Sequence, residues 1–225
     1  MPGPTSRALI IVIVCAAVLA IALRAHRAAA GDGEISPGIR AATLNLAGVA
    51  PEDRAWIQSA IATARPEAQR LIAEIDGVVK IDTSLNQPGS SLPSVPGGAI
   101  GLMIPTGGNV IVALDVKRLN GDRAIDRNMV VLHELGHVID LLLVDDKLIH
   151  RLDAGIPASR ECPEAWDGAV SCTAVQERFA DTFAKWALRG RFSIAGSGYG
   201  VPTPPSLEDW GMPLGALAIQ LDMQR

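Results

Sequence analysis

The segment VVLHELGHVID, residues 130–140, constrains the fold of this chain more than any other stretch. His133, Glu134, His137 and Asp140 interrupt an otherwise apolar run. At about 100° per residue in a helix, the two histidines and Asp140 fall within roughly 60° of one another, with Glu134 at the edge of that stripe. The apolar remainder predicts a helix packed inside a domain. Its narrow polar stripe then needs a partner other than bulk water, and a metal ion would serve.

The residue types of this stripe suit zinc. A catalytic zinc ion is held by three protein ligands, typically imidazole nitrogens and a carboxylate, and keeps one position open for water. His133 and His137 would supply two of the ligands from one helical face. Glu134 can reach the water as general base and pass its proton to a leaving amine. The plainer alternative is two core histidines beside a surface glutamate.

A second helix is predicted for QERFADTFAKWALRG, residues 176–190. A capping-box pattern at Thr173 would open it, and Gly190 would close it. Three aromatic residues line one of its faces: Phe179, Phe183 and Trp186. Glu177 and Asp181 lie together on a different face, beside the small residues Ala180 and Ala184. This helix can therefore present paired carboxylates to the histidine stripe.

The third zinc ligand has several candidates: Asp140, His150, Asp153, Glu161, Glu164, Glu177 and Asp181. Glu177 is favoured because helix packing would fix its position. Asp140 is bound to the same helix as the histidines and would strain a tetrahedral site, so we expect it beside the ligands. Asp153 and the two later glutamates lie in a loop-like stretch, and His150 is expected at the surface. Asp181 could accept the other ring N–H of a ligand histidine.

HELGH followed about forty residues later by ERFAD resembles the gluzincin zinc metallopeptidases, and most of all the peptidases similar to the anthrax lethal factor catalytic domain. The resemblance covers about residues 98–190. It implies that His133 and His137 bind zinc, that Glu134 is the base and that Glu177 is the third ligand. It also implies that Asp181 orients a ligand histidine. The large N-terminal domains of lethal factor have no counterpart, so receptor translocation is not implied.

The expected fold class is α+β, a zincin-like domain with a small mixed sheet or hairpin packed on the HELGH helix. A helical stretch should run from Pro51 to Ile75, bent or divided at Pro66. A short strand is predicted at Val78–Ile81, and Ala99–Ile104 and Asn109–Leu114 should form a β-hairpin. The peptidase domain would then comprise residues 51–225, preceded by a linker at 31–50.

Residues 1–30 are interpreted as an export signal or membrane anchor, because residues 8–23 are uninterrupted apolar sequence flanked by arginines. Cys162 and Cys172 bracket a short acidic loop, and a disulfide between them would persist only in an oxidising compartment. Two unrelated thiols are the alternative. Both features favour a location outside the cytoplasm, with membrane contact only through residues 8–23. The net charge of -4 gives no reason to expect nucleic acid as a partner.

The predicted function is that of a zinc endopeptidase with one Zn²⁺ per chain and a peptide or protein substrate. Tyr199, the one tyrosine, could stabilise the oxyanion or simply anchor a Gly/Pro-rich loop. A non-catalytic extracellular binding protein on a peptidase-like zinc scaffold is the alternative, although a structural zinc needs no base at Glu134. A membrane-anchored structural module without metal would leave the polar stripe unexplained.

Overall fold

The computed structural model describes residues 44–92, 99–122, 125–158, 174–192 and 200–224. It begins with two helices, α2 (Pro51–Thr63) and α3 (Pro66–Glu74), each of which has proline in its first turn. Proline suits this position because its missing N–H would have no helical partner there. The predicted division of the helical stretch at Pro66 is therefore confirmed.

A three-stranded mixed sheet follows, with strand order β1-β3-β2. Strand β1 (Val79–Asp82) runs parallel to β3 (Val110–Leu114), and β2 (Gly101–Pro105) runs antiparallel to β3. The short first strand and the hairpin are thus confirmed. One face of β3 is fully buried through Val110, Val112 and Leu114, because every second side chain points to the core.

The remaining elements are helices: α4 (Val116–Gly121), α5 (Arg127–Leu143), α6 (Asp146–Ala154), α7 (Val175–Ala187) and α8 (Leu207–Met223). The HELGH helix and the ERFAD helix are α5 and α7, as predicted. The other three were not foreseen, and the loop expected around Asp153 is in fact α6. Side-chain caps at Asp115, Asp145 and Ser206 open these three helices, each accepting a backbone N–H of the first turn.

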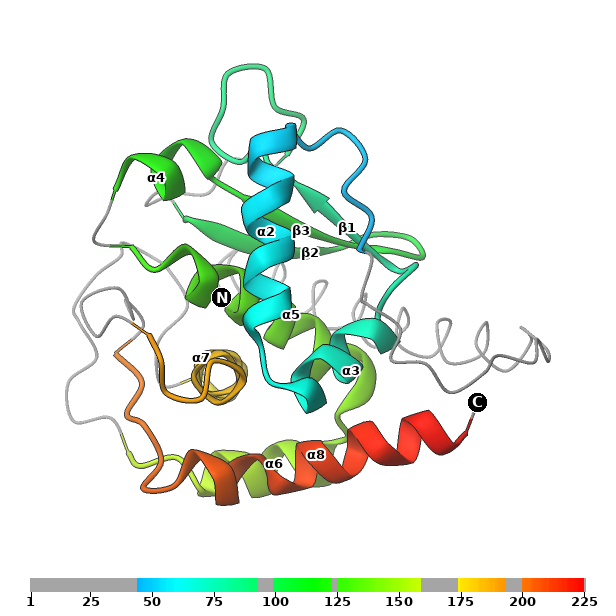
Figure 1. Ribbon diagram of the computed structural model, residues 1–225, viewed down its shortest axis with the longest axis vertical. Coiled ribbons are helices and arrows are strands. Elements are labelled where there is room, and N and C mark those ends of the chain that lie inside the picture. Colours follow the sequence, from blue (N-terminus) through cyan, green and yellow to red (C-terminus); the bar gives the residue numbers. More distant parts are fainter. Residues whose placement is uncertain (1–43, 93–98, 123–124, 159–173, 193–199, 225) are drawn as a thin grey trace, which may run out of the picture.

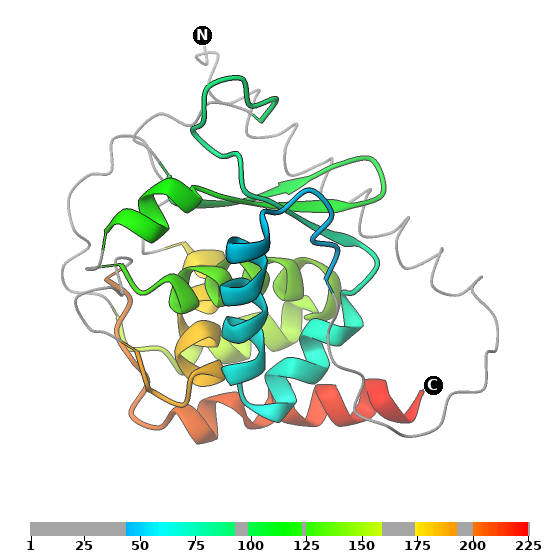
Figure 2. The ribbon, with the colours of Figure 1, turned by 45° about the horizontal axis from the view of Figure 1, so that its top comes forward.

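The elements stack in layers (Figures 1 and 2). The sheet forms one layer, α2, α5 and α7 lie beneath it, and α8 lies on the side away from the sheet. Helix α5 contacts both β2 and β3 and packs most extensively against α7. The polar residues of α5 therefore sit between the sheet edge and a second helix. The mixed sheet and helices are compatible with the α+β expectation, whereas the zincin-like assignment stays a prediction.

One expectation about a segment boundary needs correction. The linker cannot extend to residue 50, because Leu44, Leu46 and Val49 are buried in the core and Asn45 bridges to β1. Helix α7 has Ala174 as its N-cap, without a side-chain cap, and Thr173, where the capping box was expected, lies outside the described residues. None of the helices in the described part of the chain has the length and apolar character needed to cross a bilayer.

Candidate metal centre

Three potential metal ligands converge where α5 meets α7. The Nε2 atoms of His133 and His137 lie 3.1 Å apart. The Glu177 carboxylate lies against both, with Oε2 at 3.2 Å from His133 Nε2 and Oε1 at 3.2 Å from His137 Nε2. Among the described residues these three form the group whose ligand atoms could hold one metal ion. The ligand set expected from the sequence is therefore brought together.

The spacing of these atoms fits a tetrahedral metal site. Zinc binds nitrogen and oxygen at about 2.0 to 2.1 Å, so two ligand atoms at the corners of a tetrahedron lie about 3.3 Å apart. The separation of the two histidine nitrogens, and the distance from each of them to its nearer Glu177 oxygen, are each within about 0.2 Å of that value; the two histidines face different oxygens of the carboxylate. Two imidazoles and one carboxylate leave a fourth corner for water or substrate. The donor set and its geometry therefore fit a catalytic zinc ion.

Small residues allow the two ligand-bearing helices to approach closely. A β-carbon built at Gly136, in the middle of HELGH, would lie 3.0 Å from Ala180 Cα and 3.2 Å from Phe183 Cδ1. On the other side of α7, the Trp186 ring occupies the space against α8 that a side chain at Gly211 would need. Packing on both sides thus fixes α7, and with it the position of Glu177.

The electrostatics of the ligands favour metal binding at neutral pH. Burial lowers the pKa of His133 to about 4, so its imidazole is neutral. Burial acts to raise the pKa of Glu177, but hydrogen bonds from both histidines outweigh it and lower that pKa to about 2. Burial also acts to lower the pKa of His137, yet the hydrogen bond to Glu177 and the charge of Glu134 raise it. The raised pKa makes His137 the ligand whose proton would compete most with a metal ion.

Glu134 is buried beside the three ligands and faces the edge strand. Burial raises the pKa of its carboxyl group to about 7. A β-carbon at Gly101, the first residue of β2, would lie only 2.4 Å from Glu134 Oε1 and 2.7 Å from its Cγ. Glycine at residue 101 therefore lets the strand backbone reach the carboxylate.

Asp181 and Lys185 form a buried ion pair one and two turns beyond Glu177 on α7. Lys185 Nζ lies 2.5 Å from Asp181 Oδ2, and neither side chain is more than 3% exposed. When ionised, the carboxylates of Glu134, Glu177 and Asp181 carry three negative charges against one ammonium. The net charge of the group would then be -2, and burying that charge without a counter-ion costs free energy. A divalent cation would neutralise it.

Asp140, His150 and Asp153 are not part of the group of converging ligand atoms, although the charges of Asp140 and His137 interact. Asp140 is half-buried on α5, and burial together with the charge of Asp146 raises its pKa to about 6. His150 is exposed on α6, as expected of a surface histidine. Asp153 binds the Arg178 guanidinium, with Oδ1 2.6 Å from Nε. These residues therefore do not compete with Glu177 for the third position.

Some predicted residues fall outside the described part of the chain. They are Tyr199, Cys162, Cys172, Glu161, Glu164 and the apolar segment 8–23. Their roles stay predictions.

Several residues that shape the site were not identified from the sequence. Gly101 and Gly136 matter because a side chain at either residue would clash with a neighbour. Arg178 and Lys185 are charged but buried, with 8% and 2% of their surface exposed. Arg178 also donates to the Ile156 and Pro157 carbonyl oxygens and so ties α7 to the end of α6. Two cations in a helix predicted to pack against the HELGH helix were the available signal, because lysine and arginine are rarely buried without a partner.

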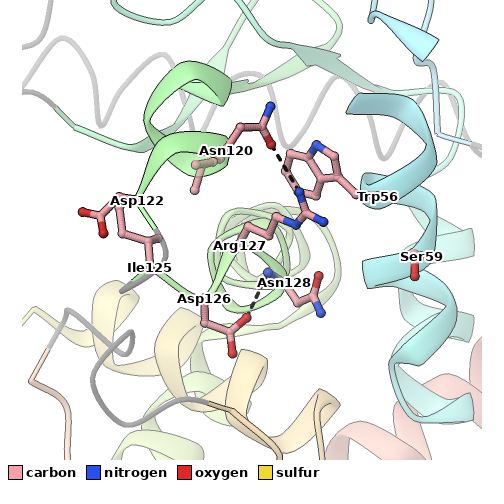
Figure 3. A pocket seen from close by; sticks show the side chains of 9 residues that line it. Trp56, Ser59, Asn120, Asp122, Ile125, Asp126, Arg127 and Asn128 are labelled. Carbon is pink, nitrogen blue, oxygen red and sulfur yellow. Dashed lines mark hydrogen bonds between the residues drawn. The ribbon is translucent and has the colours of Figure 1, made fainter. Parts of the chain in front are cut away.

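A separate cavity of about 420 Å³ lies at the N-terminal end of α5 (Figure 3). The Arg127 guanidinium stacks 5.0 Å from the Trp56 ring centroid and donates to Asn120 Oδ1. Asp53 accepts hydrogen bonds from Trp56 Nε1 and Asn120 Nδ2, and Asp126 caps α5. These polar groups bind one another, so the cluster serves to fix the start of the helix that carries the histidines.

Comparison with known proteins identifies no relative: no family model, curated protein or solved structure matches this sequence.

Proposed function

We propose that this domain is a zinc-dependent endopeptidase of the gluzincin type. The observation that carries the proposal is the convergence of His133 Nε2, His137 Nε2 and the Glu177 carboxylate at 3.1 to 3.2 Å beside a buried glutamate. Structural zinc sites normally use four protein ligands, whereas catalytic sites use three and add a nearby base. Three converging ligands and Glu134 support the catalytic alternative.

When bound, zinc would supply a Lewis acid that polarises a carbonyl group and lets water ionise near neutral pH. His133, His137 and Glu177 would hold it. Glu134 accepts the proton of the attacking water and donates it to the amine that leaves. Its pKa of about 7 in the metal-free protein suits proton transfer in both directions at neutral pH.

An extended peptide is the substrate that the surroundings of Glu134 favour. Strand β2 is an edge of the sheet, and within the described ranges no strand pairs with its free side. The strand contains no charged residue, although edge strands usually carry charges that prevent pairing with other chains. A substrate strand can add to β2 through main-chain hydrogen bonds, and Gly101 would bring that strand next to Glu134.

The alternative is a non-catalytic binding protein that uses the same zinc scaffold. It would have no use for a carboxylate buried beside the ligands, since such a group costs free energy unless it is paired or protonated. Retention of Glu134, 3% exposed, therefore favours the enzyme.

The test compares the parent protein with Glu134→Gln. We expect the variant to bind one zinc ion per chain, as the parent does, and to lose nearly all cleavage of a peptide library. Glu52→Gln, at an exposed glutamate in the first turn of α2, is the matched control and should keep full activity. Equal cleavage by parent and Glu134→Gln would exclude the mechanism.

We also propose that the enzyme acts outside the cytoplasm, exported or anchored through residues 8–23. Its basis is the sequence alone: the apolar segment and the pair Cys162 and Cys172. Non-reducing mass mapping of protein from its native compartment should find these two cysteines joined. Free thiols there would count against export.

A further inference from the structure

The ammonium group of Lys185 is buried and binds a residue that lies outside helix α7. Its Nζ atom donates to the carbonyl oxygen of Val201 at 2.5 Å and lies 5.8 Å from the centroid of the Phe192 ring. It also lies 2.5 Å from Asp181 Oδ2. An ammonium has three N–H donors; here one donates to the Val201 carbonyl oxygen, and the charge is paired with Asp181. Tertiary packing, rather than α7 alone, determines where this charge sits.

Glu177, Asp181 and Lys185 follow one another at intervals of four residues, so they form one row along α7. The first member of the row contacts both histidines of α5. The second is fully buried, and neither of its carboxylate oxygens has a hydrogen-bond partner in the described part of the structure, although Oδ2 forms the ion pair with Lys185. A carboxylate in that position needs a fixed cation to remain charged and ordered, and Lys185 supplies it.

We propose that Lys185 is a positioning residue for the metal site: through its contacts with Asp181 and the Val201 carbonyl oxygen it fixes the part of α7 that follows Glu177, and it thereby sets zinc affinity without touching the metal. The inference rests on the proposed zinc site. A lone positive charge would repel zinc, but here the charge of Asp181 offsets it. Loss of Lys185 should therefore weaken zinc binding through lost position rather than strengthen it through lost repulsion.

The experiment measures the zinc dissociation constant, by competition with a chelator, and the melting temperature of the metal-free protein. Lys185→Met should weaken zinc binding about 10- to 100-fold, the range found when groups that orient metal ligands are removed. Arg70→Met is the control. It removes another cation, one that is partly buried and bound to Asp222 of α8, so it should affect stability only and leave zinc affinity unchanged.

The double variant Asp181→Asn/Lys185→Met separates positioning from folding. It removes both buried charges, so its melting temperature should recover relative to Lys185→Met while zinc binding stays weak. Recovery of zinc affinity together with stability would mean that Lys185 is only structural. Unchanged or tighter zinc binding by Lys185→Met would also overturn the inference and leave the zinc site intact. A parent protein that binds no zinc would instead overturn the proposed function.

Discussion

Gly136 of α5 lies so close to Ala180 of α7 that a β-carbon at residue 136 would be 3.0 Å from the Ala180 Cα atom. This contact joins the two helices that carry the potential zinc ligands. His133 and His137 flank Gly136 on α5, and Glu177 lies one turn before Ala180 on α7. The separation of the helices at this point therefore sets the distance between the histidines and the carboxylate.

Gly136→Ala should weaken zinc binding, because the added methyl group pushes α7 away from α5. Overpacking of this kind also costs about 1 to 3 kcal/mol of stability. Chelator competition measures the zinc affinity. Gly121→Ala, at a helical glycine with open space around it, is the control and should leave the affinity unchanged. Equal affinity of Gly136→Ala and parent would mean that the helices separate without disturbing the ligands.

Gly101→Ala should retain zinc and lose activity. The new β-carbon would lie 2.4 Å from Glu134 Oε1, so the carboxylate must move. A displacement of about 1 Å at a reacting group can cost roughly 100-fold in rate. Steady-state kcat, measured beside zinc content, tests this. Gly107→Ala, in the hairpin turn where a β-carbon meets nothing within 4 Å, is the control. A kcat equal to that of the parent would show that the close approach of β2 to Glu134 does not matter for activity.

Stability of the metal-free protein should respond to pH through Glu134. Burial raises its pKa from 4.5 to about 7 in the folded protein, so the folded state binds this proton more tightly than the unfolded chain. Its contribution to stability is therefore present below pH 4.5, falls as pH rises towards 7 and stays low above that. At pH 8 the buried charge costs on the order of 3 kcal/mol.

Glu134→Gln removes that charge, so it should raise the melting temperature at pH 8 and change it little at pH 4. Thermal unfolding in the presence of a chelator measures the difference, with Glu52→Gln as the exposed counterpart. A difference that does not vary between the two pH values would show that Glu134 is not buried as a titrating group.

The sequence was sufficient to predict the elements whose pattern is local. The spacing of His133 and His137 predicts a helix. The two apolar runs joined by glycine predict the β-hairpin. Helices α6 and α8 escaped prediction. Helix α6 is short and mostly polar, and α8 contains Gly211, Pro213 and Gly215. Such residues disfavour helix formation, and here packing against Trp186 overrides that preference.

Contacts between distant segments could not be predicted from the sequence. The apposition of Glu177 to the histidines was inferred from resemblance and paired carboxylates, and the structure brings them together. The pairing of Asp181 with Lys185, four residues later on the same helix, could have been inferred from the spacing, whereas the hydrogen bond from Lys185 to the Val201 carbonyl oxygen depends on folding. Asp181 was expected to orient a histidine, and the structure pairs its Oδ2 atom with Lys185. The orienting role stays a prediction.

The most direct test of the zinc site is the zinc content and affinity of the parent protein and of Glu177→Ala. In the proposed site Glu177 is the one oxygen ligand, and each of its two oxygens lies 3.2 Å from one histidine nitrogen. The account predicts one tightly bound zinc ion per chain in the parent and almost none in Glu177→Ala. Zinc bound as tightly by Glu177→Ala as by the parent would contradict it.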